Sequence, residues 1–274
     1  MSINGRAGAD GASRDWGGDK LAVKSQRKLI IILSRIGVLA LLLALWWWGA
    51  DKVPRGIVPS PGATFDAALR LWSSGQLSTA LFDSLQIYTS GLAIATVVGI
   101  TTGVIMGTFR PIGQALDVFV YALAATPRVA FIPLIILILG LGFEAKTFVV
   151  FLGAVMPVIL NTYTGVQNTD PELIEMARST GASRGRIFAH IVLPGSVPFL
   201  VVGLRLAATI GLINTVVAEL YTAVRGLGGL LAIYGNTFRM AEYFVIVLTL
   251  AAVGVVVTEL LRLLEQRLGR WRER

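Results

Sequence analysis

The chain has 274 residues, of which 55% are hydrophobic and only 15% are charged, and its mean hydropathy of +0.73 indicates an integral membrane protein rather than a soluble one. The net charge of +8 does not indicate nucleic-acid binding, because the Lys and Arg residues flank apolar segments instead of gathering on one soluble surface. The absence of Cys excludes disulfides and thiolate metal sites, and the single His190 argues against a histidine-built metal site or catalytic triad.

Residues 1–28 are rich in Gly, Ala, Ser and Asp near the amino terminus and lack apolar periodicity, so we predict a disordered tail there. We predict a transmembrane domain over residues 29–274. Its first apolar run, Ile36–Ala50, begins too far from the first residue for a secretory signal and does not end in small residues. This run is therefore expected to be an uncleaved anchor, with Arg35 extending to the lipid headgroups.

Spans of about 20 apolar residues are needed to cross a bilayer core. The segments that meet this requirement predict six transmembrane helices, at about 30–50, 84–107, 115–140, 146–166, 197–221 and 243–263. The third segment contains Pro127, Arg128 and Pro133, which predicts a broken helix. Broken helices are tolerated at membrane depth only where protein buries them or where they line a cavity, so we expect this segment to face the bundle interior.

The distribution of positive charge predicts the orientation of the chain. Six spans place both termini on one side, and the side with more Lys and Arg in its short flanks is expected to be cytoplasmic. The richer side carries Lys20, Lys24, Arg27, Lys28, Arg110, Arg178, Arg184, Arg186, Arg262, Arg267, Arg270, Arg272 and Arg274. The other side carries Lys52, Arg55, Arg70, Lys146, Arg225 and Arg239. Both termini and the loop at 167–193 are therefore predicted to be cytoplasmic.

The polar stretch that begins at Asp170 predicts a short cytoplasmic helix over 171–180. Asp170 suits the N-cap, Pro171 the first helical position, and Gly181 the left-handed residue that ends a helix. Its side chains at three- and four-residue spacing form a small, mostly apolar face outside the bilayer. This face consists of Leu173, Met176, Ala177 and Thr180. It either binds a partner or rests on the chain's own membrane helices.

A second short helix is expected after the first. Ser183 is placed to cap it, and Ile187 and Ile191 give it an apolar side. The stretch "VLPGSVP" is then expected to break the chain and to lead into the fifth span from about Ser196.

These residues carry a resemblance to the signature cytoplasmic loop of bacterial ABC importer permeases. The matching residues are Glu175, Ala177, Gly181, Ile191, Leu193 and Pro194. Met176 departs from the Ala that this loop usually has. The stretches "VPSPGATFDAALRLWSSGQL", "ATPRVAFIPLIILILGLG" and "VGLRLAATIGLINTVVAELYTAVRGLGGL" resemble the nitrate, taurine and alkanesulfonate branch of these permeases. The resemblance covers residues from about 57 to 265, with a core from about 80 to 265.

The resemblance implies an all-α polytopic membrane protein of the type I importer architecture in the bacterial inner membrane. It implies that the loop at 168–194 docks onto a separate ABC ATPase, present in two copies, and that an extracytoplasmic binding protein delivers the solute. A second permease copy would complete a homodimer. The implied coupling residues are Leu173, Glu175, Met176, Ala177, Thr180, Gly181, Ala182, Ile191, Leu193 and Pro194.

The chain is expected to be a transport subunit rather than an enzyme. It has no Gly-Lys pair and therefore no P-loop, so ATP and Mg²⁺ are expected on the partner ATPase and no cofactor on this chain. The alternatives are an ion-coupled secondary transporter and a membrane enzyme, but no cluster of carboxylates or Ser-His pair favours the latter. The solute stays open between a small anion, such as a sulfonate or nitrate, and a neutral or cationic vitamin precursor.

Four polar residues within the spans are candidates for the translocation pathway: Arg128, Arg205, Asn214 and Glu219. Intramembrane charges usually face a bundle interior, so Arg128 and Arg205 either contact an anionic solute or brace helix packing. Arg205 and Glu219 lie fourteen residues apart, ~21 Å along one helix, so each needs a different partner. An interhelical hydrogen bond suits Asn214 better than a pathway role does, and a structural role near the outer end of the span suits Glu219 better.

Two glycine-rich stretches have structural interpretations. Gly99, Gly103 and Gly107 lie four residues apart and predict a close helix contact, within the chain or across a dimer. The stretch "RGLGG" at 225–229 lacks the Lys of a phosphate loop and predicts a turn on the outer side.

Overall fold

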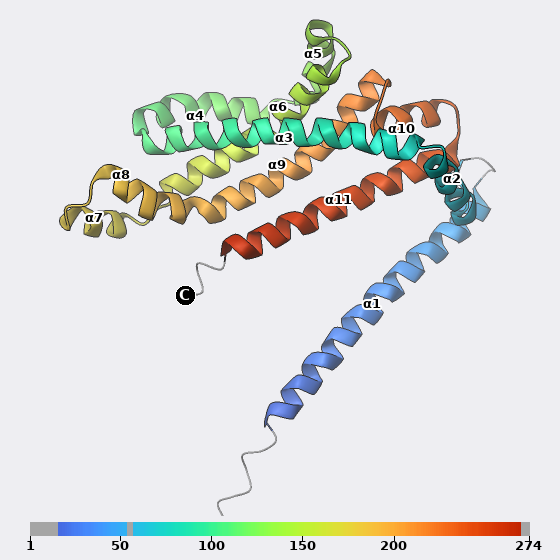
Figure 1. Cartoon of the computed structure of the whole chain (residues 1–274), viewed down its shortest axis with the longest axis horizontal. Coiled ribbons are helices and arrows are strands. Elements are labelled where there is room, and N and C mark those ends of the chain that lie inside the picture. The colour runs from blue at the N-terminus through green and yellow to red at the C-terminus, as the bar shows by residue number, and fades with distance from the viewer. Residues whose placement is uncertain (1–15, 54–56, 270–274) are drawn as a thin grey trace, which may run out of the picture. The chain divides into compact units, whose positions relative to one another are not determined.

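The structure is a computed structural model that describes residues 16–53 and 57–269 (Figure 1). The chain divides into two compact units, residues 1–62 and 63–274, which are described separately. This division differs from the predicted boundary at residue 28. The first half of the predicted disordered tail, residues 1–15, lies outside the described residues.

The first unit is dominated by one long helix, α1 (Trp16–Lys52). Its segment from Ile30 to Lys52 is long and apolar enough to cross a membrane, as predicted for the first span. Residues 16–28 are helical, so the prediction of disorder there is wrong. This segment contains Leu, Ala, Lys, Gln and Arg, which are good helix formers, and it extends a helix that the apolar segment nucleates. The indole of Trp46 in α1 donates to the carbonyl of Pro59, which lies beyond the helix, at 3.0 Å.

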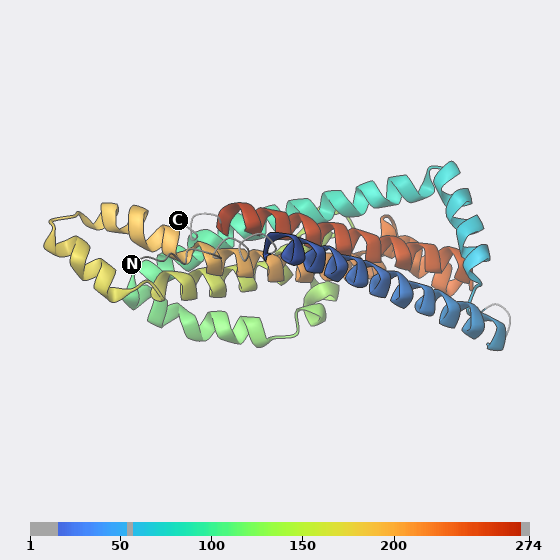
Figure 2. The ribbon, with the colours of Figure 1, turned by 90° about the horizontal axis from the view of Figure 1, so that it is seen from below.

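In its described residues the second unit consists of helices joined by short turns, in agreement with the predicted all-α class. It comprises most of α2 (Pro61–Ser73), then α3 (Gln76–Thr108), α4 (Arg110–Ala125), the 3₁₀ turn η1 (Arg128–Phe131), α5 (Ile132–Leu139), α6 (Phe143–Gln167), α7 (Pro171–Ser179), α8 (Arg184–Ile187), the π-helical turn η2 (Phe188–Val192), α9 (Leu193–Thr222), α10 (Leu227–Asn236) and α11 (Met240–Gly269). Helices α3, α6 and α9 lie side by side, with α7 and α8 at one end of this bundle and α2 and α10 at the other (Figures 1 and 2).

The predicted spans are confirmed, with one of them bent. Within the second unit's described residues, four helical segments are long and apolar enough to cross a membrane. They are α3, α6, the run from Arg184 to Thr222 and the segment of α11 from Met240 to Leu263. The third predicted span is a pair of segments, 110–125 and 128–139, that meet at 83°. The break falls at Pro127, which lacks the backbone N–H that a continuous helix requires.

The broken span only partly faces the interior of the unit. Ile132 and Ile135 are buried, whereas Leu137 is 81% exposed and Ile138 is 71% exposed. The expectation that this segment faces the interior therefore holds for one side of α5 and is wrong for the other side within a single chain.

The predicted break at "VLPGSVP" is wrong, because the chain stays helical from Arg184 to Thr222. The turn η2 widens the hydrogen-bond register, so that the N–H of Leu193 donates to the carbonyl of Phe188. This change of register occurs just before Pro194, so the helix accommodates a residue that has no N–H to donate and continues through it.

The glycine-rich face of α3 packs on α6 of the same chain. A Cβ added at Gly99 would lie 2.6 Å from Cβ of Val158, and one added at Gly103 would lie 2.6 Å from Cβ of Thr162. These contacts are too short for any side chain, so the glycines allow the two helices to approach closely. The predicted helix contact is confirmed, and its partner lies within the chain.

Candidate functional site

Helix α7 is closed at both ends by local hydrogen bonds. The Asp170 carboxylate accepts from the N–H of Glu172 at 2.9 Å, which confirms the predicted N-cap. At the other end Gly181 has φ +80°, and its N–H donates to the Arg178 carbonyl at 3.0 Å. The N–H of Ala182 donates to the Ala177 carbonyl, also at 3.0 Å. This pair of bonds is a Schellman motif, so the sequence alone defines where the helix stops.

No residue of α7 is buried. Leu173 is 45% exposed and Met176 is 60% exposed, and Thr180 beyond the helix is exposed as well. Ala177 is half-buried, and Glu175 is exposed. A face with two large exposed apolar side chains on a helix that belongs to no membrane span is suited to binding another protein.

The remaining predicted coupling residues follow α7 along the chain. Ser183 caps α8 by accepting from the N–H of Arg186 at 3.4 Å, as predicted. Ile187 is buried and Ile191 is half-buried, so they attach this segment to the bundle. Leu193 and Pro194 are exposed at the start of α9.

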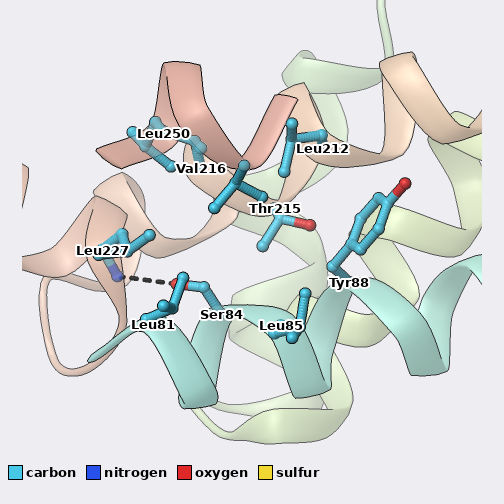
Figure 3. Close-up of a pocket in the computed structure, with 10 residues that line it drawn as sticks. Leu81, Ser84, Leu85, Tyr88, Leu212, Thr215, Val216, Leu227 and Leu250 are labelled. Atoms are coloured by element: carbon cyan, nitrogen blue, oxygen red, sulfur yellow. Dashed lines mark hydrogen bonds between the residues drawn. The ribbon is translucent and has the colours of Figure 1, made fainter. Parts of the chain in front are cut away.

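The opposite end of the bundle contains a buried polar cluster centred on Glu219, near the end of α9. Glu219 is 0% exposed. The Ser84 hydroxyl of α3 lies 2.8 Å from each oxygen of its carboxylate, and the N–H of Gly228 donates to Oε2 at 2.8 Å. The N–H of Leu227 in turn donates to Ser84 Oγ at 2.8 Å (Figure 3). The carboxylate thus acts as a cap for α10 that comes from another helix.

Glycines at the start of α10 make room for this carboxylate. Gly226 has φ +90°, a backbone conformation that favours glycine, and a Cβ added there would overlap the carboxylate of Glu219. A Cβ at Gly228 would lie 2.5 Å from the Val216 carbonyl. The predicted outer turn at 225–229 is therefore a turn followed by a helix start.

A small cavity lies beside the Glu219 cluster. The cavity beside it has about 10 Å³ and is lined mainly by apolar side chains, including Leu81, Tyr88 and Leu212 (Figure 3). Ligand sites are usually more than ten times larger. Lys146, which is 4% exposed in the first turn of α6, interacts electrostatically with Glu219 and Asp83.

The four candidate pathway residues do not form one cluster. Arg128 donates to the Gly153 carbonyl of α6 at 3.3 Å, and Gly153 also contacts the amide of Asn214 on α9, so these two candidates share a neighbour. Asn214 is buried and donates to the Ile210 carbonyl at 3.0 Å. A pathway role for either residue stays a prediction.

Arg205 and Glu219 have different partners, as their separation along α9 requires. The Arg205 guanidinium pairs with Glu265 of α11, and both side chains are nearly half exposed. Pathway roles for Arg205 and Glu219 likewise stay predictions.

Sequence reasoning did not find Ser84, Lys146, Gly226 or Gly228 as neighbours of Glu219. Ser84 lies 135 residues from Glu219 in the chain, so no local pattern connects them. One local signal is present in the sequence: Gly226 and Gly228 follow the intramembrane carboxylate Glu219 by fewer than ten residues, which leaves room for the carboxylate beside the backbone.

Comparison with known proteins gives relatives of one kind. The family model described as binding-protein-dependent transport system inner membrane component matches residues 95–270, more than half of the chain. A probable ABC transporter permease protein of Brucella abortus is 33% identical over 83% of this chain and 91% of its own length. A putative aliphatic sulfonates transport permease protein of Escherichia coli is 36% identical over 78% of this chain and 82% of its own length.

Solved structures share the fold. A chain of a methionine ABC transporter in an inward-facing conformation aligns with a TM-score of 0.56 at 20% identity, covering 69% of this chain and 92% of that chain. A chain of an amino acid ABC transporter aligns with a TM-score of 0.58 at 19% identity, with the same two coverages. The chain therefore belongs to the family of binding-protein-dependent transport system inner membrane components and is the permease subunit of an ABC importer.

Proposed function

We propose that α7 binds a separate ATPase and couples its closure to movement of the membrane helices. The observation that carries this proposal is the exposed apolar face of α7, which includes Leu173 and Met176 on a helix capped at both ends and outside every described span. Two copies of the ATPase bind ATP and Mg²⁺, and this chain has no nucleotide site and no cofactor of its own. Closure of the ATPases shifts the population of the permease between inward-open and outward-open states.

The experiment is an exchange of charge between two faces of α7. Met176→Arg places a charge on the exposed apolar face, where binding of a partner would bury it without a counter-ion. Arg178→Met makes the reverse exchange on the far side of the same helix and is the matched control. We expect Met176→Arg to insert normally and to lose the ATPase on co-purification, while the control retains it. Normal ATPase retention and wild-type uptake by Met176→Arg would place the docking face elsewhere.

We propose further that the working permease is a homodimer whose copies meet at α5. Backbone breaks at membrane depth are tolerated where protein covers them. Leu137 and Ile138 are the most exposed apolar residues of the segment that follows the break, so a second copy is a suitable cover. Since the native chain has no Cys, Ile138→Cys gives a single thiol for cross-linking in the membrane. We expect a cross-linked dimer with Ile138→Cys and none with the control Val97→Cys, an exposed position on α3. Monomer alone from both variants would contradict this interface.

The proposed cargo is a small organosulfonate anion, delivered by an extracytoplasmic binding protein. Relatives named for aliphatic sulfonates and taurine support this choice, whereas another relative is a riboflavin transport permease of Chloroflexus aurantiacus. Uptake of labelled taurine, ethanesulfonate, nitrate and riboflavin by cells with the complete transporter tests it. We expect sulfonate uptake that stops on ATP depletion and survives a protonophore added with ATP maintained. Protonophore-sensitive uptake would instead favour an ion-coupled secondary transporter.

The proposed orientation places both termini and the α7–α8 loop in the cytoplasm of the bacterial cell. Arg178, Arg184 and Arg186 of this loop support it through the positive-inside rule. A Cys introduced at Ser183 is expected to react with an impermeant thiol reagent only after the cells are opened. Labelling of intact cells would reverse the orientation.

A further inference from the structure

Arg128 stands at the break of the third span and binds carbonyl groups from two helices. Its Nη2 donates to the Ala124 carbonyl of α4 at 2.9 Å, and its Nη1 donates to the Gly153 carbonyl of α6 at 3.3 Å. In the part of the chain that the structure describes, no carboxylate forms an ion pair with it. Its guanidinium is therefore held by backbone oxygens rather than by a counter-ion.

Both carbonyls lack the usual helical donor. Gly153 lies four residues before Pro157, which stands inside α6 and has no N–H to donate. Ala124 belongs to the last turn of α4, where carbonyl groups have no intrahelical partner. In an apolar surrounding an unpaired carbonyl is costly, so a donor is required at each place.

Gly153 also connects this site to α9. A Cβ added at Gly153 would overlap Nδ2 of Asn214, so the absence of a side chain allows α9 to approach α6 at the point that Arg128 reaches. The break of the third span, the proline-interrupted part of α6 and the second half of α9 thus come together at Gly153.

We propose that Arg128 is a positioning residue that fastens the broken third span to the carbonyl left free by Pro157 in α6. The planar guanidinium suits this role because its terminal nitrogens point in two directions and serve two acceptors at once, which a lysine ammonium on a single stem does less well. The fastened segments behave as one body when the helices rearrange.

The role of Arg128 competes with direct contact to an anionic solute. Each terminal nitrogen donates one of its two N–H groups to a carbonyl, and Nε is a buried donor without a partner. The two roles differ in one respect that is accessible to experiment. If Arg128 serves the Gly153 carbonyl, restoring an N–H at residue 157 makes Arg128 less necessary, whereas a solute contact is indifferent to that change.

The test is a double-mutant cycle on the full chain in lipid nanodiscs. Arg128→Ala is expected to lower the thermal unfolding midpoint by roughly 5 °C, the size of losing a charge-assisted hydrogen bond in a chain of this length. In the Pro157→Ala background the loss is expected to be less than about half as large, because an alanine at this position supplies the missing N–H donor. Pro198→Ala is the matched control, since Pro198 also stands inside a helix, α9, but the carbonyl groups that accept from Arg128 are those of Gly153 and Ala124 and not that of Pro194, four residues before Pro198. Equal losses in all three backgrounds, or no loss in the native one, would overturn the proposal.

A second readout is taurine uptake by cells with the complete transporter, and this arm rests on the proposed function. We expect Arg128→Ala to reduce uptake several-fold, Arg128→Lys to retain part of it, and Pro157→Ala to restore the Arg128→Ala variant to at least half of the rate of Pro157→Ala alone. Loss of uptake that Pro157→Ala does not relieve, together with an unchanged unfolding midpoint, would assign Arg128 to the solute instead. If the wild type does not take up taurine, the proposed cargo is wrong and the unfolding cycle still decides the role of Arg128.

Discussion

The two ends of the helix bundle use a short helix in opposite ways. At one end α10 begins against a carboxylate from α9, and Glu219 accepts hydrogen bonds from Ser84 and Gly228 in a buried cluster. At the other end α7 is capped by its own neighbours, Asp170 and Gly181, and leaves its apolar residues exposed. A helix that completes its contacts within the chain is part of the scaffold. A helix with only local caps is stable enough to form and is free to bind something else.

The largest effect is expected from Glu219→Ala at the buried end. The substitution leaves the Gly228 N–H and the Ser84 hydroxyl without their acceptor in a buried site, which costs about 3 kcal/mol. Glu219→Gln keeps an acceptor and is expected to cost less. The measurement is thermal unfolding in nanodiscs, with the exposed Glu259→Gln as control, and an unchanged midpoint for Glu219→Ala would show that the cluster does not support the fold.

The next largest loss of stability is expected from Gly228→Ala in α10, whereas the same substitution at the adjacent Gly229 is expected to have little effect. Gly228→Ala places a Cβ 2.5 Å from the Val216 carbonyl and 2.7 Å from Cβ of Glu219, an overpacking expected to cost about 2 kcal/mol. The nearest atom to a Cβ at Gly229 is 3.5 Å away, an ordinary contact. Gly229→Ala is therefore the control, and similar unfolding midpoints for the two variants would contradict the packing described at this end.

A smaller effect is expected from Gly181→Ala at the exposed end. A Cβ at Gly181 meets no atom within 4 Å, so the whole cost is that of the left-handed backbone, roughly 1 kcal/mol. Gly185 is equally open but lacks a positive φ, which makes Gly185→Ala the matched control. Hydrogen exchange of residues 171–182 is expected to rise about fivefold with Gly181→Ala alone. A rise with Gly185→Ala of the same size would assign the effect to something other than the helix stop.

The smallest effect on the whole fold is expected from Asp170→Ala. It removes the N-cap bond to Glu172, worth about 1 kcal/mol to α7, and touches no other element. We expect faster hydrogen exchange in α7 with an unchanged global unfolding midpoint. A clear fall of the global midpoint would mean that α7 is part of the scaffold after all, and the contrast between the two ends would fail.

Features set by neighbouring residues were predicted from the sequence. The caps of α7 at Asp170 and Gly181 were predicted because a cap joins groups only a few residues apart. The spans were predicted because the length of an apolar run must match the bilayer. The break at Pro127 was predicted because proline lacks an N–H wherever the rest of the chain lies. The same local reasoning failed at Pro194, where a wide turn just before the proline keeps the helix continuous.

Features set by distant residues were decided only by the tertiary structure. Glu219 is recognisable in the sequence as an intramembrane carboxylate, but its partner Ser84 lies on α3, 135 residues away, and nothing local identifies it. The glycines of α3 predict a close contact, yet only the structure shows that its partner is α6. Arg128 has two possible roles in the sequence, and only the structure shows that the Gly153 carbonyl lies within reach of its guanidinium. In each case the sequence supplies a residue suited to one kind of contact, a polar pairing or a close helix approach, and the packing of the helices selects the partner.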